Sequence, residues 1–301
     1  KWCKAKIGGN VMEFVIENEH LIVTVKDKGA EVSSVIAKKT GIEYIWQADE
    51  KVWNRHAPVL FPFVGRLKED SFRYKGNTYP MGQHGFARDS KFSVHERLTD
   101  SITFILAPNG HFKDVYPFLF ELQLTYQLFE NQLSVIYKVK NLDENTMYYS
   151  IGGHPGFNVP LTEGEAFEDY YVKMTPETSR ERLLLEGPYL AADKALEVEQ
   201  NNFPLQRELF LNDAIILKTP EPTTVTLASK KGEHGVTMSY EDFDYLGIWT
   251  KPQQDATYVC LEPWCGLADR SDSDGVLERK TAIQSLEPGN KRYYVHRIAF
   301  F

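Results

Sequence analysis

Four segments of the chain have a composition that suits proton transfer. Each sets an ionisable side chain among glycine, proline or aromatic residues. Glycine permits close backbone approach, proline fixes φ, and aromatic rings exclude water, so such a segment can hold a polar group rigidly in an apolar cleft. The segments are residues 61–66 (FPFVGR), 82–88 (GQHGFAR), 152–157 (GGHPGF) and 260–264 (CLEPW).

Two residues in these segments, Glu262 and His154, are of the types that general acid–base catalysis needs. A carboxylate can accept a proton, and a histidine, with an ordinary pKa of about 6.5, can donate one near neutral pH. Each also has a structural alternative, which is a charge at a strand edge for Glu262 and a histidine that caps a turn for His154. Buried polar groups are often structural, so the hypothesis depends on the four segments together.

The sequence predicts that the elements that position these groups are β-strands. Apolar side chains from Phe120 to Leu128 alternate with polar ones, and the alternation resumes from Leu133 to Val139 after a polar link. This period of two predicts an antiparallel hairpin with one buried face. Further strands are predicted at residues 21–25, 101–106, 214–218, 223–228, 236–240, 258–261 and 292–300, and a short helix is considered only near residues 179–185.

Many short strands separated by polar turns predict an all-β fold, either a sandwich or a barrel. A length of 301 residues is compatible with one large β domain, and we find no repeat or linker that would divide it. Residues 1–11 do not fit the strand pattern that follows. We expect them to be a leader, either derived from cloning or disordered, and residues 12–301 to form the domain.

The composition argues against several classes of partner. The net charge is −8, with no basic stripe that could follow a nucleic acid, and charges interrupt every apolar run before it reaches the ~20 residues of a membrane span. Cys3, Cys260 and Cys265 are too few for a disulfide framework, and their spacing is not that of a usual zinc site. We therefore expect reduced thiols, a cytoplasmic protein and no metal.

Taken in chain order, the motifs resemble the aldose 1-epimerase (galactose mutarotase) family. The match runs from Met12 to near the end and comprises an arginine after FPFVG, histidines in QHGFAR and GGHPGF, an aspartate in FLND and a glutamate in LEPW. With IWTKP and LEPW, the chain is similar to the bacterial branch rather than to the longer animal enzymes. The resemblance implies a single-domain galactose-mutarotase-like β-sandwich, or supersandwich, with a sugar lying across one sheet.

The resemblance also implies a role for each site residue. Mutarotation removes a proton from the C1 hydroxyl and delivers one to the ring oxygen, so one base and one acid suffice and no cofactor is expected. Trp249 could offer its ring to the sugar or be a core residue, while Arg66 and Asp213 have a salt bridge and a turn as their structural alternatives. The implied roles are Glu262 as base, His154 as acid, His84 near the ring oxygen, and Arg66 and Asp213 on sugar hydroxyls.

The sequence leaves two other functions open. Arg88, together with Arg66, could clamp a hexose 6-phosphate, although the acidic balance and the lack of a basic cluster favour a free aldose. A non-catalytic carbohydrate-binding protein would keep the cleft but would need neither acid nor base.

A metal-dependent hydrolase and a glycosidase are less well supported. His84 and His154 lack the spacing of helical metal ligands, and a glycosidase needs two carboxyl groups where the sequence nominates only Glu262. The expected partner is thus a small sugar. A homodimer stays open, because apolar surface patches cannot be seen in a sequence.

Overall fold

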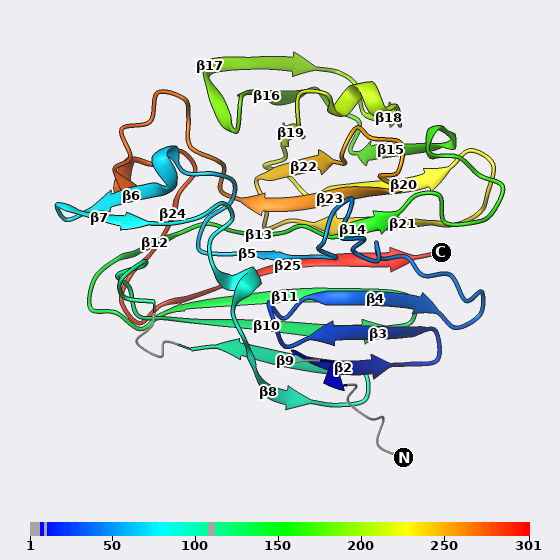
Figure 1. Cartoon of the computed structure of the whole chain (residues 1–301), viewed down its shortest axis with the longest axis horizontal. Helices are drawn as coiled ribbons and strands as arrows, with labels where there is room; N and C mark the ends of the chain where they lie inside the picture. Colours follow the sequence, from blue (N-terminus) through cyan, green and yellow to red (C-terminus); the bar gives the residue numbers. More distant parts are fainter. Residues whose placement is uncertain (1–6, 9–10, 108–111) are drawn as a thin grey trace.

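The computed structural model describes residues 7–8, 11–107 and 112–301, whose regular secondary structure is almost entirely β-strand (Figure 1). Within these ranges no helix is long and apolar enough to cross a membrane. The helical elements there are short 3₁₀ turns, namely η1 (Lys68–Asp70), η2 (Ala87–Asp89), η3 (Phe167–Asp169), η4 (Arg207–Phe210) and η5 (Leu277–Arg279). The prediction of an all-β, single-domain protein is confirmed.

The largest sheet has nine strands, all paired antiparallel. It includes the hairpin predicted from period-two alternation, whose two long strands pair from Phe120 opposite Asn141 to Phe129 opposite Gln132. In spatial order the strands are β18 (Asn202–Pro204), β15 (Tyr170–Thr175), β20 (Thr223–Ser229), β21 (Gly235–Tyr240), β25 (Lys291–Phe300), β11 (Gln132–Asn141), β10 (Phe120–Phe129), β9 (Ser101–Leu106) and β8 (Ser93–Arg97).

A second, eight-stranded sheet carries the site. Its order is β17 (Tyr189–Val198), β16 (Arg180–Glu186), β19 (Ile215–Lys218), β22 (Tyr245–Trp249), β23 (Tyr258–Cys265), β13 (Ile151–Gly153) and β5 (Val59–Leu60), with β14 (Gly156–Asn158) also paired to β23. Smaller sheets are formed by β1 (Ile7–Gly8), β2 (Val11–Glu17), β3 (Leu21–Lys26) and β4 (Val32–Ala37), by β6 (Ser71–Tyr74) with β7 (Asn77–Pro80), and by β12 (Met147–Tyr149) with β24 (Gln284–Leu286).

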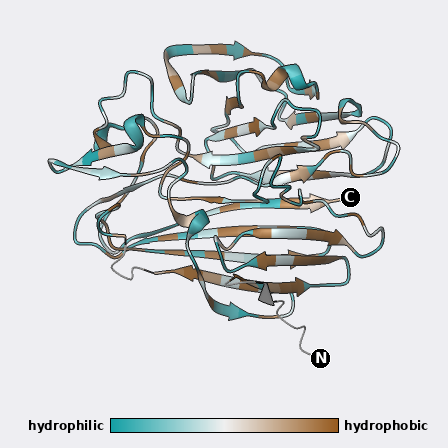
Figure 2. Ribbon diagram, in the orientation of Figure 1, coloured by the Kyte–Doolittle hydropathy of each residue, from teal (hydrophilic) through white to brown (hydrophobic). Residues whose placement is uncertain are grey.

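The main core lies between the nine-stranded sheet on one side and the eight- and four-stranded sheets on the other. Val25 of β3, Leu124 of β10 and Leu261 of β23 are all fully buried in it. Hydrophobic and hydrophilic positions alternate along the strands, as the colours of Figure 2 show. Because neighbouring side chains point to opposite faces, a strand can give one face to the core and the other to a site.

The segment considered as a short helix is a strand, so that expectation was wrong. Residues 180–186 form β16, which pairs antiparallel with β17 on one side and β19 on the other. These neighbours satisfy the backbone hydrogen-bonding groups of the segment, and a partner strand that is distant in sequence overrides weak local preference.

Part of the predicted leader lies in strands. Residues 7–8 form β1, which pairs with the start of β2 at Val11 and Met12. Residues 1–6, 9 and 10, and with them Cys3, lie outside the described residues. Cys260 and Cys265 are buried and free, as expected for reduced thiols.

A buried ion pair fixes the loop that follows β23. The Nζ of Lys280 donates to Asp269 Oδ1 and to the carbonyl of Leu267, each at 2.8 Å. Asp269 Oδ2 in turn accepts the backbone N–H of Lys68, and the backbone N–H of Asp269 donates to the carbonyl of Arg66. This loop is thereby tied to the segment that follows FPFVG.

Replacing Lys280 should destabilise the fold strongly. Lys280→Met leaves the Asp269 carboxylate buried without its cation, and we expect a loss of about 3 kcal/mol or more in the free energy of unfolding. Urea denaturation at neutral pH measures it. The exposed pair of Arg279 with Asp274 provides the control, since Arg279→Met should change stability little. Equal effects of the two substitutions would contradict a structural role for the buried pair.

Candidate active site

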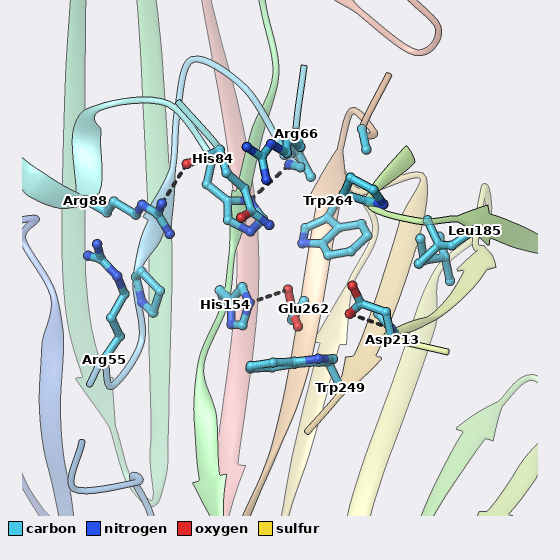
Figure 3. A pocket seen from close by; sticks show the side chains of 18 of the residues that line it. Arg55, Arg66, His84, Arg88, His154, Leu185, Asp213, Trp249, Glu262 and Trp264 are labelled. Atoms are coloured by element: carbon cyan, nitrogen blue, oxygen red, sulfur yellow. Dashed lines mark hydrogen bonds and ion pairs between the residues drawn. The ribbon is translucent and has the colours of Figure 1, made fainter. Parts of the chain in front are cut away.

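One pocket of about 240 Å³ gathers every residue that the sequence nominated. It opens on the outer face of the eight-stranded sheet, away from the core (Figure 3). The nominated residues in its lining are Arg66, His84, Arg88, His154, Asp213, Trp249 and Glu262, and the other polar or aromatic members are Trp53, Arg55, Gln83 and Trp264.

Glu262 is in the middle of β23, a strand buried along its whole length. Alternation sends Leu261 into the main core and Glu262 to the pocket, with Trp264 two residues further on the same face. Figure 3 shows the carboxyl group of Glu262 between the indole rings of Trp264 and Trp249. The side chain of Glu262 is only 2% exposed, so the carboxyl group is almost entirely removed from water.

Strand pairing places His154 across from Glu262. On one side Gly152 of β13 pairs with Trp264, and on the other Gly156 of β14 pairs with Cys260. Both pairings share one antiparallel register, so the residue midway between the two glycines faces the residue midway between their partners. That residue is His154, whose Nε2 lies 3.1 Å from Glu262 Oε2.

The glycines of GGHPGF are required by close packing around this pair. A Cβ at Gly152 would lie 2.7 Å from Cδ1 of Trp264, and one at Gly156 would lie 2.7 Å from Cζ3 of Trp53. Such distances are shorter than van der Waals contact, so a larger residue would push an indole out of the pocket wall. The motif therefore makes room for the aromatic rings that surround His154.

The surroundings keep both members of the pair uncharged. Burial, followed by the charge of Asp213, raises the pKa of Glu262 well above its ordinary value of 4.5. Burial, together with the charges of Arg88 and Arg55, lowers the pKa of His154 to about 3. Both shifts favour the neutral forms, so the carboxyl group is the favoured site for the one dissociable proton of the pair. Among the described residues Glu262 Oε2 has no hydrogen-bond partner, so its 3.1 Å separation from His154 Nε2 is a close approach without an aligned hydrogen bond.

His84 is held as a neutral hydrogen-bond donor. Its Nδ1 accepts the backbone N–H of Gly65 at 3.0 Å, which leaves the imidazole proton on Nε2. Its own backbone N–H donates to the carbonyl of Gly65, and its φ is +64°. Burial, with the nearby His154, lowers the pKa of His84 well below 6.5. The ring packs edge-on against His154, with centroids 5.6 Å apart.

Arg66 and Asp213 line the pocket but have neighbours of their own. The guanidinium of Arg66 makes two 2.9 Å hydrogen bonds to Asp70, and this pairing raises the pKa of Arg66. Asp213, at φ +71°, accepts the backbone N–H of Ala214 and is exposed. The salt bridge and the turn named as structural alternatives are therefore present, and contact of these side chains with a sugar stays a prediction.

Trp249 packs on other aromatic rings and also lines the pocket, while contact of its ring with a sugar stays a prediction. It is half-buried at the end of β22, and its ring packs edge-on against Trp53 at 5.5 Å and His154 at 5.6 Å between centroids. The indole therefore supports the His154 ring and lines the pocket at the same time.

The sequence motifs did not nominate Arg55 or Trp53, which both line the pocket. Both belong to the segment WNRH, whose aromatic and basic residues precede FPFVG and were the available signal. Figure 3 places Arg55 beside Arg88, on the far side of the two histidines from Asp213. A third missed residue, Trp264, lies within the motif that nominated Glu262.

One group in the described residues has the composition of a metal site. His154, Cys260 and Glu262 each offer a ligand atom, all within 4.8 Å of one another. Burial raises the pKa of the Cys260 thiol well above its ordinary value, as it does for Glu262. A metal would have to displace both protons from buried groups, so this arrangement favours proton transfer over metal binding.

Comparisons with known proteins agree on one family. The family model described as aldose 1-epimerase matches residues 12–294. The plasmid-encoded protein LacX of Lactococcus lactis subsp. lactis is 35% identical, over 94% of this chain and 98% of LacX. A galactose mutarotase related enzyme from Lactobacillus acidophilus has a TM-score of 0.94 at 41% identity, covering 96% and 97% of the two chains. A galactose mutarotase-like protein from Lactobacillus casei has a TM-score of 0.90 at 33% identity, covering 96% and 100%.

Removing the buried carboxyl should stabilise the protein in a pH-dependent way. The folded state binds a proton at Glu262 more tightly than the unfolded chain, so this group's stabilising contribution is full below about pH 4.5 and is lost as pH rises towards the raised pKa. Glu262→Gln has no proton to lose. We therefore expect its stability relative to the unchanged protein to increase between pH 5 and pH 8.

Denaturation midpoints at several pH values measure this effect. Glu278→Gln, which alters an exposed glutamate on η5, is the matched control and should show no such trend. A constant difference between the Glu262→Gln variant and the unchanged protein at all pH values would contradict a raised pKa for Glu262.

Proposed function

The chain belongs to the aldose 1-epimerase family, and from this premise we propose that it interconverts the α and β anomers of an aldose. The observation that carries the proposal is the contact of His154 with Glu262, 3.1 Å apart at the centre of the pocket. These two groups supply the one base and one acid that opening and closing of a sugar ring require.

The proton held by the pair lets it act at both ends of the C1–ring oxygen bond. When that proton passes to His154, Glu262 becomes a carboxylate that can take the C1 hydroxyl proton. His154 then gives its proton to the ring oxygen as the C1–oxygen bond breaks. The aldehyde rotates about its C1–C2 bond, and closure on the other face returns each proton, so the pair ends as it began.

The other pocket residues fit supporting roles. His84, with its proton on Nε2, can donate a hydrogen bond to a developing negative charge at the ring oxygen without itself changing charge. Trp264 and Trp249 border Glu262 and reduce its solvation, which strengthens its interactions with a bound sugar. We propose that Asp213 and Arg66 contact sugar hydroxyls at the rim of the pocket.

The lack of a basic cluster in the sequence favours a free aldose over a 6-phosphate. In the pocket, however, Arg55 lies next to Arg88. The negative net charge of the whole chain therefore does not predict the charge at this end of the pocket. A purely carbohydrate-binding role is less well supported, because binding alone gives no reason to bury an ionisable pair with opposed pKa shifts.

Polarimetry tests the proposed activity directly. Freshly dissolved α-glucose and α-galactose, in a buffer that catalyses mutarotation weakly, should relax to the same final rotation faster when the protein is present. No acceleration with any aldose, including phosphorylated ones, by a folded sample would contradict the proposal and favour a binding protein.

Substituting the base should reduce turnover while sparing binding. Glu262→Gln keeps the size of the side chain and removes its ability to accept a proton, so kcat should fall by ~10²-fold or more. Calorimetric titration with the sugar should show affinity within a few-fold of the unchanged protein. Near-normal turnover of the variant would remove Glu262 from the mechanism.

A further inference from the structure

Arg55 and Arg88 form a cationic end of the pocket, and we propose that this end binds an anionic substituent on the aldose, at the exocyclic carbon next to the ring oxygen. The inference rests on the proposed mutarotase function and specifies its substrate class. It also replaces the pairing of Arg66 with Arg88 that the sequence suggested.

The two guanidinium groups share one carboxylate. Arg55 Nη1 and Nη2 lie 3.2–3.3 Å from the carboxylate oxygens of Asp89, and Arg88 Nε lies 3.8 Å from Asp89 Oδ2. The charge of Glu31 also acts on Arg88. Both guanidinium groups line the pocket, whereas Asp89 and Glu31 do not, so at this end the charged groups of the lining are cations. Arg66 differs, because Asp70 neutralises it through two short hydrogen bonds.

Arg88 is the more buried of the pair and retains unused hydrogen-bonding capacity. Its side chain is 19% exposed, and its Nη2 donates to the carbonyl of Gln83 at 2.7 Å. Within the described residues its buried Nε has no hydrogen-bond partner. Burial together with the charge of Arg55 lowers the pKa of Arg88 to about 10, so it remains a cation at neutral pH.

The segment before FPFVG holds Arg55 in place before any ligand arrives. The backbone N–H groups of His56 and Ala57 both donate to the carboxylate of Glu31, at 2.8 and 3.0 Å. The His56 ring lies 2.8 Å from the carbonyl of Trp46. These contacts fix the backbone after Arg55, and Asp89 holds its guanidinium. A side chain held in this way loses little freedom on binding, which suits recognition of a planar or tetrahedral anion.

The position of the two arginines fixes where the anion would sit. Both lie beyond His84 and His154, on the side of the pocket opposite Asp213 (Figure 3). Both arginines line the same pocket as His84, His154 and Glu262. If His84 and His154 face the ring oxygen of the sugar, the substituent nearest to the two arginines is the exocyclic group on the carbon next to that oxygen.

A local cationic site is needed because the whole molecule repels anions. The net charge is −8, and the opposite end of the pocket carries Asp213. A neutral hexose requires no compensation for this field, whereas a phosphate monoester or a carboxylate does. Two forked arginines match either anion, and a phosphate offers more oxygen acceptors to them.

The test compares neutral and anionic aldoses on one protein. Anomer exchange is measured by NMR for glucose, glucose 6-phosphate and glucuronate with the unchanged protein, Arg55→Met, Arg88→Met and, as a control, Arg279→Met. We expect the unchanged protein to favour an anionic aldose. The ratio of kcat/KM for that aldose to kcat/KM for glucose should fall by ~10-fold or more in each pocket variant and stay constant in the control.

The substrates distinguish a phosphate from a carboxylate as the bound anion. The variants distinguish failure of the anion site from failure of the mutarotase function. Preference for glucose 6-phosphate assigns a phosphate, and preference for glucuronate assigns a carboxylate. Inorganic phosphate should inhibit the unchanged protein competitively and inhibit Arg55→Met much less. If no aldose is accelerated, the mutarotase function itself fails. If glucose is accelerated and the ratio is the same in Arg55→Met, the anion site is wrong.

A conservative variant guards against loss of folding. Arg55→Lys keeps one charge but loses the forked geometry, so the anionic preference should fall to an intermediate value. Should Arg55→Met not fold, an unaltered ratio in the folded Arg55→Lys and Arg88→Lys variants overturns the proposal.

Discussion

The cross-strand placement of His154 opposite Glu262 is the interaction on which the rest of the site depends. It follows from one register, in which β13 and β14 pair with β23 on either side of the two residues. A slip of one residue would turn Glu262 into the core, because neighbouring side chains of a strand face opposite sides. The sheet is therefore the device that fixes a 3.1 Å contact between residues more than a hundred positions apart.

Around this contact the pocket disfavours the charged forms of Glu262 and His154. Indole rings border the carboxyl group and two arginines lie beyond the histidines, so the neutral forms are favoured on both sides. The glycines that admit these rings cannot be enlarged without displacing them. Shifted pKa values of this kind are common at functional sites.

The sequence predicted the strands best where alternation was strong, as in the β10–β11 hairpin, and failed at β16, whose partners are set by tertiary pairing. The motif resemblance nominated five residues and residue-type reasoning added Arg88 and Trp249, and all seven line one pocket. The sequence could not show that Arg66 is hydrogen-bonded to Asp70, or that Arg55 lies beside Arg88. Both depend on how loops fold back beside one another. Charge summed along a chain does not reveal charge at one end of a pocket.

The pH dependence of kcat/KM for anomer exchange tests the central claim most directly, that one proton is shared by a buried pair. Activity should fall at low pH only near the His154 pKa of about 3, when the pair gains a second proton, and at high pH above the raised pKa of Glu262, when it loses its last. An acid limb near 6.5, typical of a solvated histidine, would contradict this account.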